Sequence, residues 1–172
     1  MLVETLNLAS HWAIIGSMGE TLGRRLLQTR FEGPHHEALL AILLANTSVE
    51  EMLDEAFQGT GMTVPQYNVL RILNGVYPGA HSRGDIARRM VRRAPDLTRM
   101  LDRLVRMELV EREKGDLDHR QSLARITIKG RELLDELRPK VAHLNQILSR
   151  RLDEREARAL VDLLEKIYSN ER

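Results

Sequence analysis

The sequence contains no cysteine among its 172 residues. Disulfides, thiolate metal ligands, cysteine nucleophiles and thiol-based redox sensing are therefore excluded. Aromatic residues make up only 3% of the chain, although 42% of its residues are hydrophobic. A core must accordingly be built from Leu, Ile, Val, Met and Ala, a composition that favours helices.

The sequence also lacks long apolar runs and a strong net charge. No run approaches the ~18 residues that span a bilayer, and the acidic Glu4, with no Lys or Arg before it, is a poor match to a signal peptide. We therefore expect a cytoplasmic protein without a membrane partner. The formal net charge is +1, yet residues 80–130 carry 13 Lys and Arg against 8 Asp and Glu. Such local basicity is typical of a nucleic-acid contact, although solvated helix faces also show it.

The N-terminal third is predicted to be helical. Apolar residues recur at steps of three and four over residues 2–28, where three glycines weaken the pattern. The segment Phe31–Pro34 breaks this helix, and a second helical pattern follows. We therefore expect an N-terminal helical extension over 1–30 and a dimerisation or linker helix over 35–58.

Three short helices are predicted next, each with a recognisable start. The segment Thr63–Gln66 spells a capping box, and Ser82–Asp85 resembles another. Pro95 suits the first position of a third helix, where its missing N–H costs little. In that helix the expected buried residues are Leu97, Leu101, Leu104 and Val105.

The periodicity then changes from helix to strand. Residues 110–113 and 122–128 read as two short strands, joined by the polar and charged segment 114–120. Thr127 then begins a long helix, in which Pro139 should cause a kink, and Asp153–Glu156 begins the last helix. The prediction is a mainly α fold with a small β-hairpin wing: a winged helix-turn-helix over 63–128, flanked by N- and C-terminal dimerisation helices.

The order of these elements, together with the local charge, predicts binding to double-stranded DNA. A helix fits the major groove with its N-terminal residues near the base edges. Asp96 could there accept from a cytosine or buttress an arginine, and Arg120 on the hairpin could reach a phosphate or a narrow minor groove. The predicted DNA-binding residues are Arg83, Arg92, Arg93, Pro95, Asp96, Thr98, Arg99, Arg103, Arg106, Lys114, His119 and Arg120.

Several ordered segments resemble the MarR-type family of bacterial regulators (multiple antibiotic resistance regulators). They are Pro65–Leu70, Asp85–Met90, Thr98–Leu104, Leu109–Arg112, Asp118–Arg120 and Ile126–Gly130. The resemblance implies a homodimer with interlocking terminal helices and a wing on each side, bound to a palindromic operator as a transcriptional regulator, most simply a repressor.

One position departs from that family, which usually has glycine just before the pair Leu109–Val110. This chain has Glu108 there. Either the third helix ends without a left-handed residue, or Glu108 adopts that conformation at some cost.

The C-terminal part, 129–172, is predicted to hold the dimerisation helices. Apolar residues at steps of three and four suit a helix–helix seam, whereas an intramolecular core is the alternative. The residues predicted at the dimer interface are Leu137, Val141, Leu144, Leu148 and Leu164.

The resemblance also implies a small aromatic or lipophilic effector between the dimerisation helices and the winged domain. Trp12, Tyr67 and Arg71 lie near that predicted junction, although simple packing also explains them. The adjacent His35 and His36 point in different directions on a helix, so we expect no metal site. We also expect no cofactor.

No catalytic pattern is apparent, whether paired carboxylates, a phosphate-binding glycine loop or a serine nucleophile motif. We therefore expect a regulator rather than an enzyme. The alternative is a winged-helix module for small molecules or protein partners that no longer binds DNA.

Overall fold

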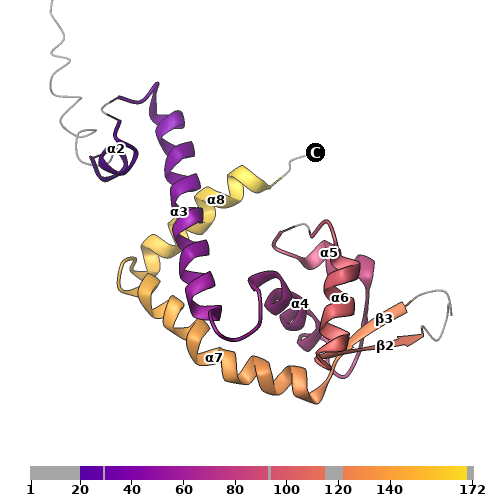
Figure 1. Cartoon of the computed structure of the whole chain (residues 1–172). Helices are drawn as coiled ribbons and strands as arrows, with labels where there is room; N and C mark the ends of the chain where they lie inside the picture. The colour runs from indigo at the N-terminus through magenta and orange to yellow at the C-terminus, as the bar shows by residue number, and fades with distance from the viewer. Residues whose placement is uncertain (1–19, 29, 93, 115–121, 170–172) are drawn as a thin grey trace, which may run out of the picture. The chain divides into compact units, whose positions relative to one another are not determined.

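The computed structural model describes residues 20–28, 30–92, 94–114 and 122–169 (Figure 1). The fold is mainly helical with one small sheet, as the sequence predicted. The described residues divide into two compact units between Glu51 and Met52, and α3 runs across this division. In chain order the elements are α2 Glu20–Leu26, α3 Pro34–Phe57, α4 Val64–Asn74, β1 His81–Ser82, α5 Arg83–Arg89, α6 Leu97–Arg106, β2 Val110–Lys114, β3 Ser122–Ile126, α7 Ile128–Ser149 and α8 Glu154–Tyr168.

The first unit contains the described part of the N-terminal extension. Helix α2 buries Leu22 and Gly23, and Leu27 follows it with a left-handed φ of 54°. Residues 1–19, and with them most of the predicted first helix, lie outside the described residues. Helix α3 matches the second predicted helix closely, and glycines with positive φ follow it at Gly59 and Gly61.

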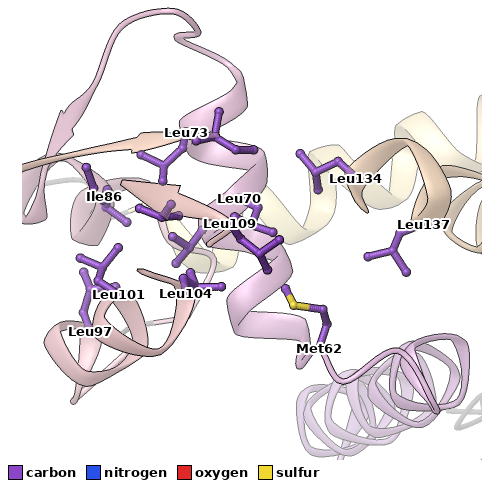
Figure 2. Close-up of a cluster of buried hydrophobic side chains, with 14 of the residues drawn as sticks. Met62, Leu70, Leu73, Ile86, Leu97, Leu101, Leu104, Leu109, Leu134 and Leu137 are labelled. Carbon is purple, nitrogen blue, oxygen red and sulfur yellow. The ribbon is translucent and has the colours of Figure 1, made fainter. Parts of the chain in front are cut away.

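The core of the second unit is built around α4. Its first turn is fixed by the predicted capping box, because Thr63 Oγ1 accepts from Gln66 N while Gln66 Oε1 accepts from Thr63 N. Helices α5, α6 and α7 and the sheet bury leucine and isoleucine side chains against α4 (Figure 2). The labelled members of this cluster are Met62, Leu70, Leu73, Ile86, Leu97, Leu101, Leu104, Leu109, Leu134 and Leu137.

The sheet has three strands in the order β1-β3-β2, all antiparallel. Strands β2 and β3 form the predicted hairpin, with Val110 opposite Ile126. Strand β1 was not predicted, because two residues are too few to show an alternating pattern. It pairs His81 with Ala124 and so joins the beginning of α5 to the wing.

Two predicted boundaries were wrong, both because a side chain caps a helix. Pro95 is not the first helical residue: Asp96 Oδ1 accepts from Arg99 N at 3.3 Å, so α6 begins at Leu97. Ile128 is not the end of a strand but the first residue of α7. Thr127 Oγ1 accepts from Gly130 N and so starts the helix at Ile128, whose side chain is 58% exposed.

Helix α7 continues through Pro139 and contributes Leu134 and Leu137 to the core. Leu137 is only 2% exposed. Its place is therefore this core rather than the predicted dimer seam, because it packs on the face of α7 that meets the rest of the unit. Helix α8 begins at the predicted capping box of Asp153 and Glu156. Within the described ranges, no helix has the length and apolar character needed to cross a membrane.

Candidate nucleic-acid interface

Helix α6 has two distinct faces. Leu97, Leu101 and Leu104 are buried, while polar and basic side chains cover the other side. All the predicted DNA-binding residues whose side chains are described are exposed: Arg83, Arg92, Pro95, Asp96, Thr98, Arg99, Arg103 and Arg106.

The remaining predicted DNA-binding residues belong to the hairpin tip and to one position before α6. Arg93, His119 and Arg120 lie outside the described residues. Lys114 is the last residue of β2, and only its backbone is described. Their contacts therefore stay predictions.

In the first turn of α6 an aspartate pairs with an exposed arginine. Asp96 caps the helix through Oδ1, and its Oδ2 lies 3.1 Å from Arg99 Nε. This ion pair agrees with one of the two roles that the sequence predicts for Asp96, and its contact with a cytosine stays a prediction. An ion pair through Nε leaves the terminal nitrogens of Arg99 for the bidentate contact that arginine makes with guanine.

A second ion pair, which the sequence analysis missed, joins α6 to the wing. Arg112 Nη2 on β2 lies 2.6 Å from Asp102 Oδ1 on α6, and the two residues form a hydrogen bond. Across the hairpin, Arg125 pairs with Glu113 at 2.8 Å. No sequence pattern signals a pair ten residues apart across a helix–strand turn, so only the fold reveals it. The pair links β2 of the hairpin to α6.

Between these elements lies a depression of about 400 Å³. It brings together Arg83 and Thr98, which the sequence predicted, and Arg112, which it did not. At its rim the Ser82 hydroxyl donates to Asp85, and this hydrogen bond lowers the pKa of the Asp85 carboxyl. The lining residues are Ser82, Arg83, Gly84, Thr98, Leu101, Arg112, Ser122 and Ala124.

Glu108 ends α6 in the left-handed conformation, with φ of 61°. Leu109 N donates to Leu104 O at 3.0 Å and Glu108 N to Val105 O at 2.9 Å, the bonding pattern of a Schellman motif. Of the two possibilities raised by the sequence, the structure shows the strained one. The Glu108 carboxylate lies 2.6 Å from Lys129 Nζ, and this hydrogen bond lowers the pKa of Glu108.

The predicted effector residues show mutual packing where they are described. The Tyr67 ring lies 4.9 Å from that of Phe57, and Arg71 Nη1 donates to the Tyr67 hydroxyl at 3.3 Å. Trp12 lies outside the described residues. Contact with an effector stays a prediction for all three predicted residues.

The histidine pair on α3 shows no metal-binding arrangement. His36 Nδ1 accepts from Glu32 N at 3.3 Å, and its ring lies edge-on to Phe31. Within the ranges that the structure describes, no three His, Cys, Asp or Glu side chains are grouped so as to hold a metal ion.

The C-terminal helices expose an apolar surface on the single chain. Of the predicted interface residues, Val141, Leu144 and Leu164 are half-buried and Leu148 is exposed. Helix α8 buries no residue, and its exposed apolar side chains are Leu160, Val161, Leu163, Ile167 and Tyr168.

Comparison with known proteins identifies the family. The MarR family model matches residues 62–122. A MarR transcription factor from Planctomyces limnophilus is 30% identical, with a TM-score of 0.61, and the match covers 79% of this chain and 98% of that one. The chain belongs to the MarR family. The comparison with curated proteins gives no significant match.

Two further solved structures show the same architecture. Wild-type MarR from Escherichia coli in its apo form is 27% identical, with a TM-score of 0.60, over 74% of this chain and 93% of that one. BpsR from Bordetella bronchiseptica is 24% identical, with a TM-score of 0.65, over 74% and 95%. MarR-family proteins are DNA-binding transcription factors rather than enzymes, so this chain is a transcriptional regulator.

Proposed function

We propose that this MarR-family regulator is a cytoplasmic homodimer that represses transcription by occupying a palindromic operator. Each α6 would read one half-site in the major groove, with the two helices held about one duplex turn, ~34 Å, apart. The apolar surfaces of α7 and α8 would form the dimer, with contributions from Leu144, Leu148 and Leu164.

The observation that carries the proposal is the first turn of α6. Asp96 pairs with Arg99 there, Thr98 is exposed beside it, and the pair Asp102–Arg112 links the helix to β2. The N-terminal residues of a helix in the major groove lie nearest the base edges, so Thr98 and Arg99 suit the reading of bases. The exposed arginines Arg83, Arg103 and Arg106 would contact phosphates and set the register.

We further propose that a small aromatic or lipophilic molecule releases the operator by favouring a dimer with a different helix spacing. BpsR, whose DNA binding is regulated by 6-hydroxynicotinic acid, supports this by sharing the fold. Trp12, Tyr67 and Arg71 are the residues that we propose for the contact.

Operator binding tests the proposal. Affinity for a palindromic site from the promoter region of the gene should fall steeply with salt, with a log–log slope of about −0.9 per neutralised phosphate. Absence of a shifted complex, together with flat salt dependence, would contradict the proposal and favour a winged-helix module that no longer binds DNA.

Three alanine variants separate the roles of the arginines. Arg99→Ala should relax the preference for one base pair by roughly 1–3 kcal/mol, whereas Arg120→Ala should weaken binding to all sequences. Arg158→Ala is the control, because this arginine is exposed on α8 and is not among the predicted DNA-binding residues. Wild-type operator binding by both Arg99→Ala and Arg120→Ala would show that the assigned interface is wrong.

A further inference from the structure

The end of α6 is attached to the beginning of α7 at several points. The Glu108 carbonyl accepts from Thr127 Oγ1 at 2.7 Å, and the Leu109 carbonyl accepts from Thr127 N at 3.1 Å. Lys129, in the first turn of α7, meets the Glu108 carboxylate at 2.6 Å. Gly130 packs so closely that a Cβ there would lie 2.3 Å from Leu109 O. The end of α6 and the beginning of α7 thus form one junction.

Stability does not explain why glutamate stands at the centre of this junction. Glycine adopts a φ of 61° without strain, whereas a residue with a Cβ pays for it. The ion pair with Lys129 offers little in return, because both side chains are mostly exposed, at 77% and 57%. The ion pair therefore does not offset the strain, and stability alone does not account for a carboxylate at this position.

The ion pair between Glu108 and Lys129 connects the end of α6 to the first turn of α7. Helix α6 carries Arg99 and Arg103, and α7 carries Leu144 and Leu148 of the proposed dimer surface. We propose that Glu108, through Lys129, is a positioning residue that fixes the orientation of α6 on α7, so that operator affinity depends on a carboxylate that does not touch DNA. The proposal rests on the proposed function, since it needs the operator complex as its readout.

The sign of the expected effect separates positioning from electrostatics. Removing a negative charge from a DNA-binding domain should strengthen its attraction to phosphates. Glu108→Gln should instead weaken operator binding, by roughly 2- to 30-fold, the range of coupling effects between sites. The salt slope should stay unchanged, because no phosphate contact is lost. Glu132→Gln is the matched control: it removes the same charge from the next turn of α7 and should not weaken binding.

Two further variants separate positioning from a structural role. Glu108→Gly should unfold at the same or a higher temperature, yet bind the operator more weakly than the wild type. The exchanged pair, Glu108→Lys with Lys129→Glu, should bind more tightly than Glu108→Gln, because it restores the ion pair in the opposite sense. A purely structural role predicts that the relaxed Glu108→Gly variant binds at least as well as the wild type.

A distance measurement tests the junction without DNA. Because the chain has no cysteine, cysteines introduced at Arg106 on α6 and Lys140 on α7 can be spin-labelled selectively. Glu108→Gln should broaden or shift the distance distribution between the labels, and Glu132→Gln should leave it unchanged.

These outcomes distinguish the two proposals. If the wild-type protein binds no operator, the proposed function fails, and an unchanged distance distribution in Glu108→Gln would then overturn the inference on its own. If the wild-type protein binds and both Glu108→Gln and Glu108→Gly bind equally tightly, the inference is overturned while the proposed function stands.

Discussion

Gly130 shows how a single hydrogen atom in place of a side chain can decide a local fold. It lies in the first turn of α7, where alanine would normally be the better helix former. A Cβ at this position would lie 2.7 Å from Ile126 Cγ1 as well as 2.3 Å from the Leu109 carbonyl oxygen. Since the oxygen belongs to the backbone, it cannot move aside as a flexible side chain would.

We therefore expect Gly130→Ala to destabilise the protein by at least about 1–3 kcal/mol, the usual range for overpacking. The matched control is Gly84→Ala in α5, where the nearest side-chain atom, Ser82 Oγ, lies at an ordinary 3.7 Å. That change should be neutral or stabilise by up to about 1 kcal/mol. Thermal or urea unfolding of both variants checks this, and equal stabilities would contradict the close contact at Gly130.

Asp96 is the second residue whose environment gives a sharp expectation. Its carboxylate caps α6, and loss of such a cap typically costs about 0.5–2 kcal/mol. Asp96→Asn should retain the cap, because asparagine is an equally good N-cap residue, and lose only the charge beside Arg99.

Asp96→Ala should therefore lower both stability and base preference, whereas Asp96→Asn should lower base preference alone. Unfolding curves, together with binding to operators that carry single base-pair changes, measure the two effects separately. If Asp96→Asn keeps the full base preference, the buttress has no role in reading DNA.

At the scale of single residues the sequence was informative wherever the chemistry is local. The capping boxes at Thr63 and Asp153 were visible because their partners lie within a few residues along the chain, and Glu108 was visible because the resembled family usually has glycine there. The pairs Asp102–Arg112 and Glu108–Lys129 were not visible, because the partners come together only once α6, the sheet and α7 have packed.

Among the elements, α6 packs one face into the core and exposes the other face, which is proposed to bind DNA. Leu104 is fully buried in the core, and truncating such a leucine to alanine costs about 2–5 kcal/mol. Arg103, the residue before it, is exposed. We therefore expect truncation of Leu104 to change stability and truncation of Arg103 to change DNA affinity.

Leu104→Ala should lower the free energy of unfolding by about 2–5 kcal/mol. Arg103→Ala should leave it almost unchanged, while weakening binding to all DNA sequences and reducing the salt slope by about 1. Denaturant titration and salt-dependent operator binding give the two numbers. A normal salt slope for Arg103→Ala would remove this residue from the phosphate contacts.

The sequence predicted the helices from α3 onwards within a few residues, because their apolar periodicity and caps agree. It failed where those signals are short or compete. The two-residue strand β1 has no periodicity to detect, and the alternation that ends in Ile128 continues past the point where Thr127 starts a helix. Pro95 suited a first helical turn, but Asp96 is the better cap.

For the whole molecule, the exposed apolar side chains of α8 predict association. Large hydrophobic residues such as Leu163, at 59% exposure, gain nothing from facing water and suit an interface between copies. The predicted seam is therefore extended to a surface that includes much of α8.

Leu163→Asp should convert a dimer of 19.7 kDa chains into monomers without unfolding the chain, because this side chain has little to lose in the single chain. Lys166→Asp is the control, since it places the same charge in the same helix at an exposed polar position. Analytical ultracentrifugation gives the mass, and circular dichroism verifies the helices. A monomeric wild-type protein, or a dimeric Leu163→Asp variant, would contradict the assigned surface.

The burial of Leu134 and Leu137 has a practical consequence for dividing this protein. The sequence placed a boundary between residues 128 and 129, but the first half of α7 completes the core that α4 and α6 begin. A fragment ending at Ile128 would lack Leu134 and Leu137, would expose the apolar core residues that they cover, and should aggregate. The core of the winged domain and the proposed dimer surface thus share one continuous helix, α7, so cleavage or truncation within this helix should disrupt both.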